Sequence, residues 1–221
     1  TLVVCIINSY NKFFNLNLTK DEIASIAFKI EREDVGIVGG AQDQYAASYG
    51  GFNFMHFRKE KVSVHPLELS SDIINEFEAS TVLYSTKIQR SASQIENEKK
   101  SLMNSEESLT AMHSIKQNAI VMNRYLQRGE IAKFAKVLHE SWENKKQVSK
   151  LVSNDHINKI YDLAIECGAY SGKISGAGGG GYMFFIVNPE SKISLIKTLM
   201  QENGQVVNFK FENQGAQAWE V

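Results

Sequence analysis

The sequence predicts an α+β fold, in which helices and strands are interleaved but do not alternate strictly. Two long amphipathic helices are expected at residues 106–126 and 131–148, whereas short β-branched and aromatic runs predict strands. A loop of glycines leads directly into one of these strands, at residues 182–187. A doubly wound parallel sheet would place a helix after every strand, so the pattern favours α+β.

The first part of the chain predicts three helices and a hairpin. Apolar side chains occur on every side of residues 2–14, which predicts a buried helix. Residues 19–22 (TKDE) have the form of a capping box, which opens a second helix that runs to about Glu33. The remaining elements expected here are a short helix and two hairpin strands, at residues 43–49, 52–57 and 61–65.

Pro66 is the expected junction between two domains, residues 1–66 and 67–221. After the two long helices, a third helix is expected from Asp155 to Cys167, with Gly168 as the C′ residue that follows it. Further predicted elements are two strands and one helix, at residues 80–85, 206–211 and 191–201.

Five of the six residues from Gly176 to Gly181 are glycine, and an apolar strand follows. Such density indicates positive φ angles or a backbone that approaches something closely. Backbone N–H groups without side chains suit phosphate oxygens. A flexible linker is the alternative, but a linker would not lie between an apolar helix and an apolar strand. The segment also fits G-x-G-x-x-G, the pattern of dinucleotide-binding loops. That motif requires a strand before it and a helix after it, whereas a strand is predicted after this loop, so the match is rejected.

Two separated carboxylates form a second candidate feature. Glu31 lies near the end of a predicted helix, a turn broken by glycines follows, and Asp43 begins the next turn. Phosphoryl transfer uses one carboxylate to hold Mg²⁺ and another to face the acceptor hydroxyl. The spacing alone fits solvated helix-end carboxylates equally well, and Glu33 competes with Glu31 as the metal ligand.

Composition excludes several classes of protein. The 24 basic and 25 acidic side chains give no overall attraction to nucleic acid or acidic lipid. Cys5 and Cys167 offer no disulfide framework, so a reducing cytoplasm is the expected compartment. The apolar run from Leu2 to Ile7 is far too short to cross a membrane.

Together, the two glycine segments resemble the GHMP kinase superfamily of small-molecule kinases. Residues 39–44 (GGAQDQ) resemble the segment that carries the catalytic aspartate of the sugar kinases. Residues 176–181 (GAGGGG) resemble the family's third, carboxyl-terminal glycine motif. Three segments resemble the subgroup of bacterial D-glycero-D-manno-heptose 7-phosphate kinases, namely residues 30–47, 50–55 and 168–173. Fucokinase-like enzymes share this pattern.

The resemblance implies a GHMP kinase fold. Residues 1–66 would be the end of an amino-terminal, ATP- and Mg²⁺-binding domain of the ribosomal protein S5 domain 2-like type. Residues 67–221 would be a ferredoxin-like carboxyl-terminal domain. The family's first motif and its ATP-phosphate loop have no counterpart here, so we expect a fragment that alone is inactive.

The resemblance also implies roles for particular residues. Asp43 would be catalytic and Glu31 would bind Mg²⁺. The glycine loop would support the transferred phosphate and the acceptor through Ser175, Gly176, Ala177, Gly178, Gly179 and Gly180. Substrate contacts are expected from Gly40, Gln42, Gln44, Arg90 and Lys173. A cation must bind the distal phosphate, with Arg90 as first candidate and a second group on the helix of Trp142, namely Lys145, Lys146 and Lys150.

The implied activity is ATP-dependent phosphorylation of the anomeric hydroxyl of D-glycero-D-manno-heptose 7-phosphate to the 1,7-bisphosphate, in nucleotide-activated heptose biosynthesis. The alternatives are a kinase for another sugar, such as L-fucose, and a non-catalytic relative that binds sugar or nucleotide. Expected partners are ATP, Mg²⁺ and a sugar phosphate, with no nucleic acid and no membrane, and the resemblance allows a homodimer.

Overall fold

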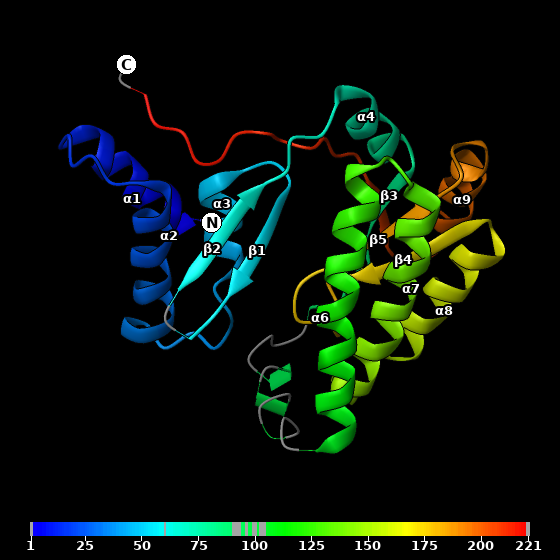
Figure 1. Cartoon of the computed structure of the whole chain (residues 1–221). Helices are drawn as coiled ribbons and strands as arrows, with labels where there is room; N and C mark the ends of the chain where they lie inside the picture. The colour runs from blue at the N-terminus through cyan, green and yellow to red at the C-terminus, as the bar shows by residue number, and fades with distance from the viewer. Residues whose placement is uncertain are drawn as a thin grey trace. The chain divides into compact units, whose positions relative to one another are not determined.

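The computed structural model describes residues 2–59, 61–89, 94–95, 97–98, 101 and 105–219. Contacts divide the chain into two units. The first unit combines residues 1–69 with residues 211–221, and the second consists of residues 70–210. In Figure 1 the first unit runs from blue to cyan and includes the red carboxyl-terminal segment, whereas the second runs from green to orange.

The first unit contains three helices and a hairpin, with the bounds α1 (Leu2–Phe13), α2 (Lys20–Lys29), α3 (Gln42–Tyr49), β1 (Asn53–Phe57) and β2 (Val62–Pro66). The predicted capping box is present, because the Thr19 hydroxyl accepts from the N–H of Glu22 and the Glu22 carboxylate accepts from the N–H of Thr19 at 2.8 Å. Helix α2 continues directly into a π-helical turn, η1 (Ile30–Asp34). The predicted end of the helix near Glu33 is therefore confirmed.

The prediction that residues 2–14 form a buried helix was right about the helix and wrong about its burial. Only Val4 and Ile7 of α1 are buried, whereas Leu2 and Phe13 are each 74% exposed. Helix α1 packs on α2 and α3 with one face. A sequence that is apolar on every side of a helix cannot show which face has a partner, so the exposed face was not predictable.

The carboxyl-terminal segment belongs to the first unit. The N–H of Ala216 donates to the carbonyl of Ala47 at 2.8 Å, and the Asn8 amide donates to the carbonyl of Ala216 at 2.9 Å. The N–H of Gly51 donates to the carbonyl of Glu212 at 2.8 Å. The sequence assignment of residues 211–221 to the second domain therefore differs from these contacts, and the domain division at Pro66 stays a prediction.

The second unit contains helices around an antiparallel sheet of strand order β4-β5-β3-β6. Its strands are β3 (Thr81–Ser85), β4 (Ala169–Ile174), β5 (Tyr182–Val187) and β6 (Gln205–Val207). Its helices are α4 (Ser71–Ala79), α6 (Glu106–Gln127), α7 (Ile131–Val148), η2 (Lys150–Val152), α8 (Asp155–Glu166), η3 (Pro189–Ser191) and α9 (Lys192–Leu199). Antiparallel pairing without β-α alternation confirms the predicted α+β class.

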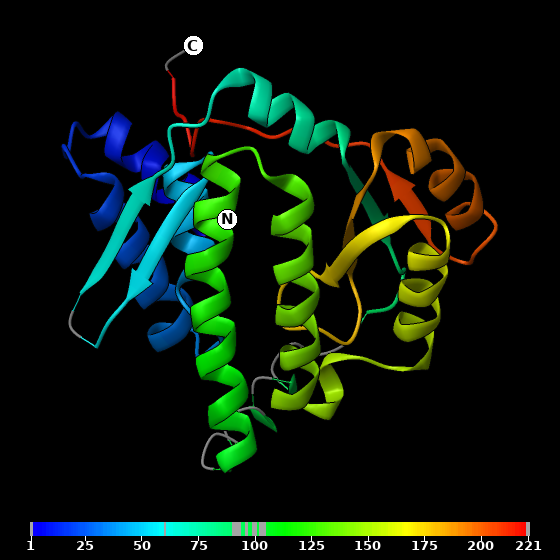
Figure 2. The same ribbon diagram turned by 45° about the vertical axis from the view of Figure 1, so that its right-hand side comes forward.

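Helices α6 and α7 lie side by side and antiparallel in both views of the molecule (Figures 1 and 2). Helices α7 and α8 pack on β4, and α9 packs on β3 and β6. The core between them contains Trp142, Tyr84 and Phe185, all with no exposed surface. This core holds β4 and β5, and so fixes both ends of the glycine loop that joins them.

The predicted strand at residues 206–211 is wrong at its carboxyl end. Strand β6 ends at Val207, after pairing with β3 only along Leu83–Ser85. The ring of Phe211 lies 4.9 Å from that of Phe52, centroid to centroid, in the first unit. The alternating apolar residues of this segment therefore serve two different units, which a strand pattern read along the sequence does not reveal.

Alkaline pH should weaken the first unit through Tyr49. Its hydroxyl donates to Asp21 Oδ1 at 2.6 Å, and burial together with this carboxylate raises the pKa of Tyr49 from 10.0 to about 12. The protonated phenol is thus favoured in the folded state, and its contribution is complete below pH 10 and lost as the pH rises through about 12. Denaturant titrations should show a smaller loss of unfolding free energy over this window for Tyr49→Phe than for the wild type. Equal losses in the two proteins would contradict this prediction.

Candidate functional site

The π-helical turn η1 brings Glu31 against helix α3. The Gln44 side-chain amide donates to Glu31 Oε2 at 2.5 Å, and Gln44 is itself fully buried. The Glu31 side chain is only 16% exposed, whereas Glu33 is exposed. An extra residue per turn rotates the end of the helix, so Glu31 faces α3 and Glu33 faces away. Between the two carboxylates considered for the metal, the geometry favours Glu31.

Arg32 is a structural residue of this site that the sequence did not reveal. Its Nε donates to the carbonyl of Gly40 at 3.2 Å, and its Nη1 donates to the carbonyl of Ile37 at 3.3 Å. A Cβ at Gly39 would lie 2.9 Å from the Arg32 guanidinium carbon. The guanidinium therefore holds the loop before α3 in place. Its Nη2 also lies 3.8 Å from Glu31 Oε2 and forms a salt bridge with that carboxylate.

Asp43 lies in the first turn of α3. Its side chain is exposed and forms no hydrogen bond with any residue that the structure describes. Its neighbour Gln44 makes the hydrogen bond to Glu31, so α3 and η1 are joined next to the Asp43 carboxylate. An exposed carboxylate on a fixed helix end can receive a hydroxyl of an incoming molecule without a rearrangement of the backbone.

A hollow of about 640 Å³ lies beside this helix end, within the first unit. Gly40 and Gln42, both predicted to contact substrate, line one wall of it. The turn between β1 and β2 lines another wall with Arg58, Lys59 and Lys61. Sequence reasoning missed these three cations because a charged hairpin turn ordinarily signals only solvation.

The predicted glycine loop joins β4 to β5 in the second unit. The N–H of Ser175 donates to the carbonyl of Tyr182 at 2.7 Å and closes its base. The N–H of Gly179 donates to Val152 at 2.7 Å, and that of Gly181 donates to Ile88 at 2.9 Å. These bonds confirm a structured loop and contradict the flexible linker.

Several glycines of the loop are required by the protein itself. A Cβ at Gly178 would lie 2.8 Å from Val152 Cα, and a Cβ at Gly180 would lie 2.4 Å from the Ile88 carbonyl oxygen. Gly176 has a φ of +73°, and nothing lies within 4 Å of its Cβ position. Within the described chain, the N–H groups of Gly176, Ala177, Gly178 and Gly180 donate to no carbonyl. These four donors are the ones available to an anion.

The predicted lysines have different surroundings. Lys145 of α7 donates from Nζ to the carbonyl of Gly176 at 2.6 Å, so it supports the loop. Lys146 lies over the rings of Trp142 and Tyr161, and pairs with Glu143 at 2.8 Å. Lys173 is half-buried on β4, and Lys150 is exposed in η2. Arg90, the first candidate for the distal phosphate, lies outside the described residues.

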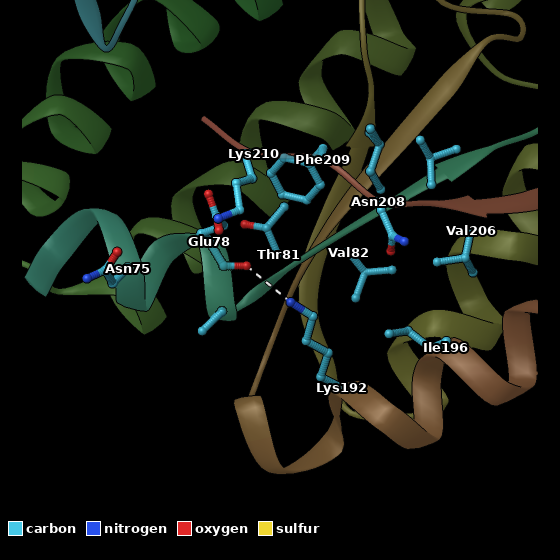
Figure 3. A pocket seen from close by; sticks show the side chains of 13 residues that line it. Asn75, Glu78, Thr81, Val82, Lys192, Ile196, Val206, Asn208, Phe209 and Lys210 are labelled. Carbon is cyan, nitrogen blue, oxygen red and sulfur yellow. Dashed lines mark hydrogen bonds between the residues drawn. The ribbon is translucent and has the colours of Figure 1, made fainter. Parts of the chain in front are cut away.

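A hollow of about 760 Å³ lies in the second unit, beside β3 and β6 (Figure 3). Lys192 Nζ donates there to the carbonyl of Glu78 at 3.1 Å, and burial lowers the pKa of Lys192. Val82, Ile196 and Val206 form apolar walls. None of the predicted site residues lines this hollow.

Two protein-family models match separate parts of the chain. The model of the GHMP kinases N terminal domain matches residues 1–51, and the model of the GHMP kinases C terminal domain matches residues 122–206. The chain belongs to the GHMP kinase family. The fold predicted from the two glycine segments is the GHMP kinase fold. Glu31 and Asp43 lie within the first match, and the glycine loop lies within the second.

Relatives of this GHMP kinase chain include proteins whose names describe them as kinases of sugars or sugar phosphates. It is 52% identical, over 100% of its length, to D-glycero-alpha-D-manno-heptose 7-phosphate kinase of Campylobacter jejuni. A crystal structure of a D-glycero-D-manno-heptose 1-phosphate kinase from Bacteroides thetaiotaomicron matches 99% of the chain with a TM-score of 0.78 and 35% identity. L-fucokinase/L-fucose-1-P guanylyltransferase of Bacteroides fragilis is 26% identical over 91% of the chain. The chain spans 66%, 61% and 22% of these proteins, respectively.

Two further findings concern the described part of the chain only. It contains no helix that is both long and apolar enough to cross a membrane. It also contains no cluster of three or more histidine, cysteine, aspartate or glutamate side chains that could hold a metal ion.

Proposed function

We propose that this chain is part of an ATP- and Mg²⁺-dependent kinase that phosphorylates the anomeric hydroxyl of D-glycero-D-manno-heptose 7-phosphate. The product would be the 1,7-bisphosphate, a precursor of nucleotide-activated heptose. The observation that carries this proposal is the 52% identity to a heptose 7-phosphate kinase over the whole chain. We further propose that the protein is cytoplasmic and that it forms a homodimer.

In this proposal Asp43 acts on the acceptor. Its exposed carboxylate accepts a hydrogen bond from the anomeric hydroxyl and takes the proton as the γ-phosphoryl group of ATP is transferred. ADP and the phosphorylated sugar are then released. Because a loose phosphoryl-transfer transition state requires little base assistance, much of the effect of Asp43 would come from positioning the hydroxyl.

Glu31 fits a magnesium ligand. Mg²⁺ is usually held by one or two carboxylates together with substrate phosphates and water, so the lack of a larger acidic cluster in the described chain is no obstacle. The Oε1 atom of Gln44 is buried beside Glu31 without a hydrogen-bond partner among the described residues. A water bound to a metal could donate to it. When bound, Mg²⁺ neutralises the charge of the ATP phosphates.

The glycine loop would donate backbone N–H groups to phosphate or acceptor oxygens. The donors available for this role are those of Gly176, Ala177, Gly178 and Gly180. Lys145 would keep the loop in the conformation that presents them, through its bond to the Gly176 carbonyl.

The test of the proposed function is a kinase assay on the product of the intact gene. ATP consumption with heptose 7-phosphate should greatly exceed that with L-fucose or galactose. Equal or faster turnover of L-fucose would overturn the heptose assignment and support the fucokinase-like alternative, which the Bacteroides fragilis relative also favours. Binding of sugar or ATP without any turnover would support the non-catalytic alternative.

Replacing Glu31 should affect the metal requirement. Glu31→Gln keeps a hydrogen-bond acceptor for Gln44 but removes the charge. We expect the Mg²⁺ concentration for half-maximal turnover to rise on the order of tenfold or more, since even outer partners of metal ligands contribute ~10–100-fold. Glu33→Gln is the matched control, because Glu33 is exposed in the same turn. Equal Mg²⁺ dependence in both variants would remove Glu31 from the metal site.

A further inference from the structure

The turn between β1 and β2 gathers positive charge at one hollow of the first unit. Arg58, Lys59 and Lys61 all line this hollow, and no aspartate or glutamate is among the lining residues that the structure describes. None of the three pairs with an acidic side chain that the structure describes. The N–H of Arg58 donates to the carbonyl of Lys61 at 3.0 Å and extends the pairing of the hairpin by one bond. Arg58 and Lys61 are therefore held next to each other at the end of the paired strands.

A second wall of the hollow adds to this positive potential. It is formed by the loop and first turn that begin α3, from Gly39 to Gln42. Ala41 occupies the N-cap position, and its side chain cannot accept a hydrogen bond. The first N–H groups of α3 therefore have no side-chain acceptor at the N-cap. The positive end of a helix favours an anion. Charged side chains and helix backbone thus contribute the same sign to a single hollow.

The remaining walls suit a sugar. Tyr45 and Phe28 contribute aromatic surface, and Ser25 contributes a hydroxyl. The volume of about 640 Å³ lies within the ~300–1,000 Å³ typical of small-molecule sites. The hollow also extends to Gln42, the residue directly before Asp43. A molecule whose reacting hydroxyl meets Asp43 can therefore place another part of itself here.

We infer that this hollow binds the distal phosphate of a phosphorylated sugar acceptor, with Arg58 and Lys61 as its main ligands. The inference rests on the proposed function, and it names the part of the chain that selects a sugar phosphate over a plain sugar. Arg58 provides a planar fork for two phosphate oxygens, and Lys61 provides a compact charge. The pair of Arg58 and Lys61 replaces Lys145 and Lys146 of α7 as candidates for binding the distal phosphate. Lys145 already donates to the Gly176 carbonyl, and Lys146 already pairs with Glu143.

The experiment measures binding and turnover separately on the product of the intact gene. Titration calorimetry with heptose 7-phosphate, and with the same heptose lacking the phosphate, is performed on the wild type, Arg58→Ala, Lys61→Ala and the double variant. Each single change should weaken binding of the phosphorylated sugar on the order of tenfold, because each removes one charge-assisted contact. Binding of the plain heptose should not change. Lys136→Ala, an exposed lysine of α7, is the matched control.

The outcomes separate this inference from the proposed function. Support requires a weaker sugar phosphate complex in the Arg58 and Lys61 variants, an unchanged Lys136→Ala protein, and a wild-type preference that decreases with added salt. If the wild type phosphorylates heptose 7-phosphate and the double variant does so with the same KM, the inference is overturned and the proposed function stands. If the wild type neither binds nor phosphorylates any of the sugars, both are overturned.

Discussion

Asp43→Asn should lower kcat for the sugar acceptor on the order of 10²- to 10⁴-fold, the range that general acid–base groups contribute. The change keeps the size of the side chain and one acceptor oxygen but removes its charge and its ability to take a proton. Because the Asp43 side chain is exposed and hydrogen-bonds to no described residue, the substitution breaks no side-chain hydrogen bond of the described fold. ATP affinity should remain close to that of the wild type, since the carboxylate is assigned to the acceptor.

The control for this prediction is Asp34→Asn. Asp34 is also an exposed aspartate, at the end of the π-helical turn of the same unit, so it matches the change in charge. Steady-state kinetics with both substrates would separate kcat from KM. An Asp43→Asn protein with near wild-type kcat on its best acceptor would remove Asp43 from the reaction.

Gly178→Ala should strongly destabilise the glycine loop. Gly178 has a φ of +118°, and a Cβ there would lie 2.8 Å from Val152 Cα, a backbone atom that cannot move away like a side-chain end. Left-handed strain costs about 1–2 kcal/mol, and overpacking about 1–3 kcal/mol more, so we expect a loss of roughly 2–5 kcal/mol in unfolding free energy. The same displacement should abolish turnover if the loop presents its N–H groups to phosphate.

Gly176→Ala isolates the space effect from the φ effect. Gly176 also has a positive φ, +73°, but its Cβ position is open. Its loss should be limited to the left-handed strain of about 1–2 kcal/mol. Thermal unfolding of both variants, followed by circular dichroism, gives the comparison. Equal stability of the two proteins would show that the approach to Val152 does not constrain the loop.

Much of the fold was predictable because local signals agreed with the final packing. The capping box at Thr19, the glycine after α8 and the apolar strand β5 each had a local cause that tertiary contacts did not override. Where contacts decided, prediction failed. The exposed face of α1 and the early end of β6 depend on which surfaces meet, and periodicity carries no such information.

The candidate site shows the same division. Asp43, Glu31 and the glycine loop were proposed from their local motifs. Arg32 was not, because its role depends on carbonyls at Ile37 and Gly40 that a π-helical turn brings within reach. The cations of the hairpin turn were also missed, since only the folded chain places them beside the start of α3. The charged turn itself was visible in the sequence, but its neighbour was not.

The return of the carboxyl-terminal segment to the first unit affects how the chain can fold during its synthesis. Ala216 supplies the N–H that bonds to the carbonyl of Ala47, on the helix that carries Asp43. Domains usually fold in order from the amino terminus as the ribosome extends the chain. Here the last hydrogen bonds of the first unit cannot form until the entire second unit has been translated. A chain whose synthesis ends after residue 210 would therefore have a first unit without the bond from Ala216 to Ala47 of α3.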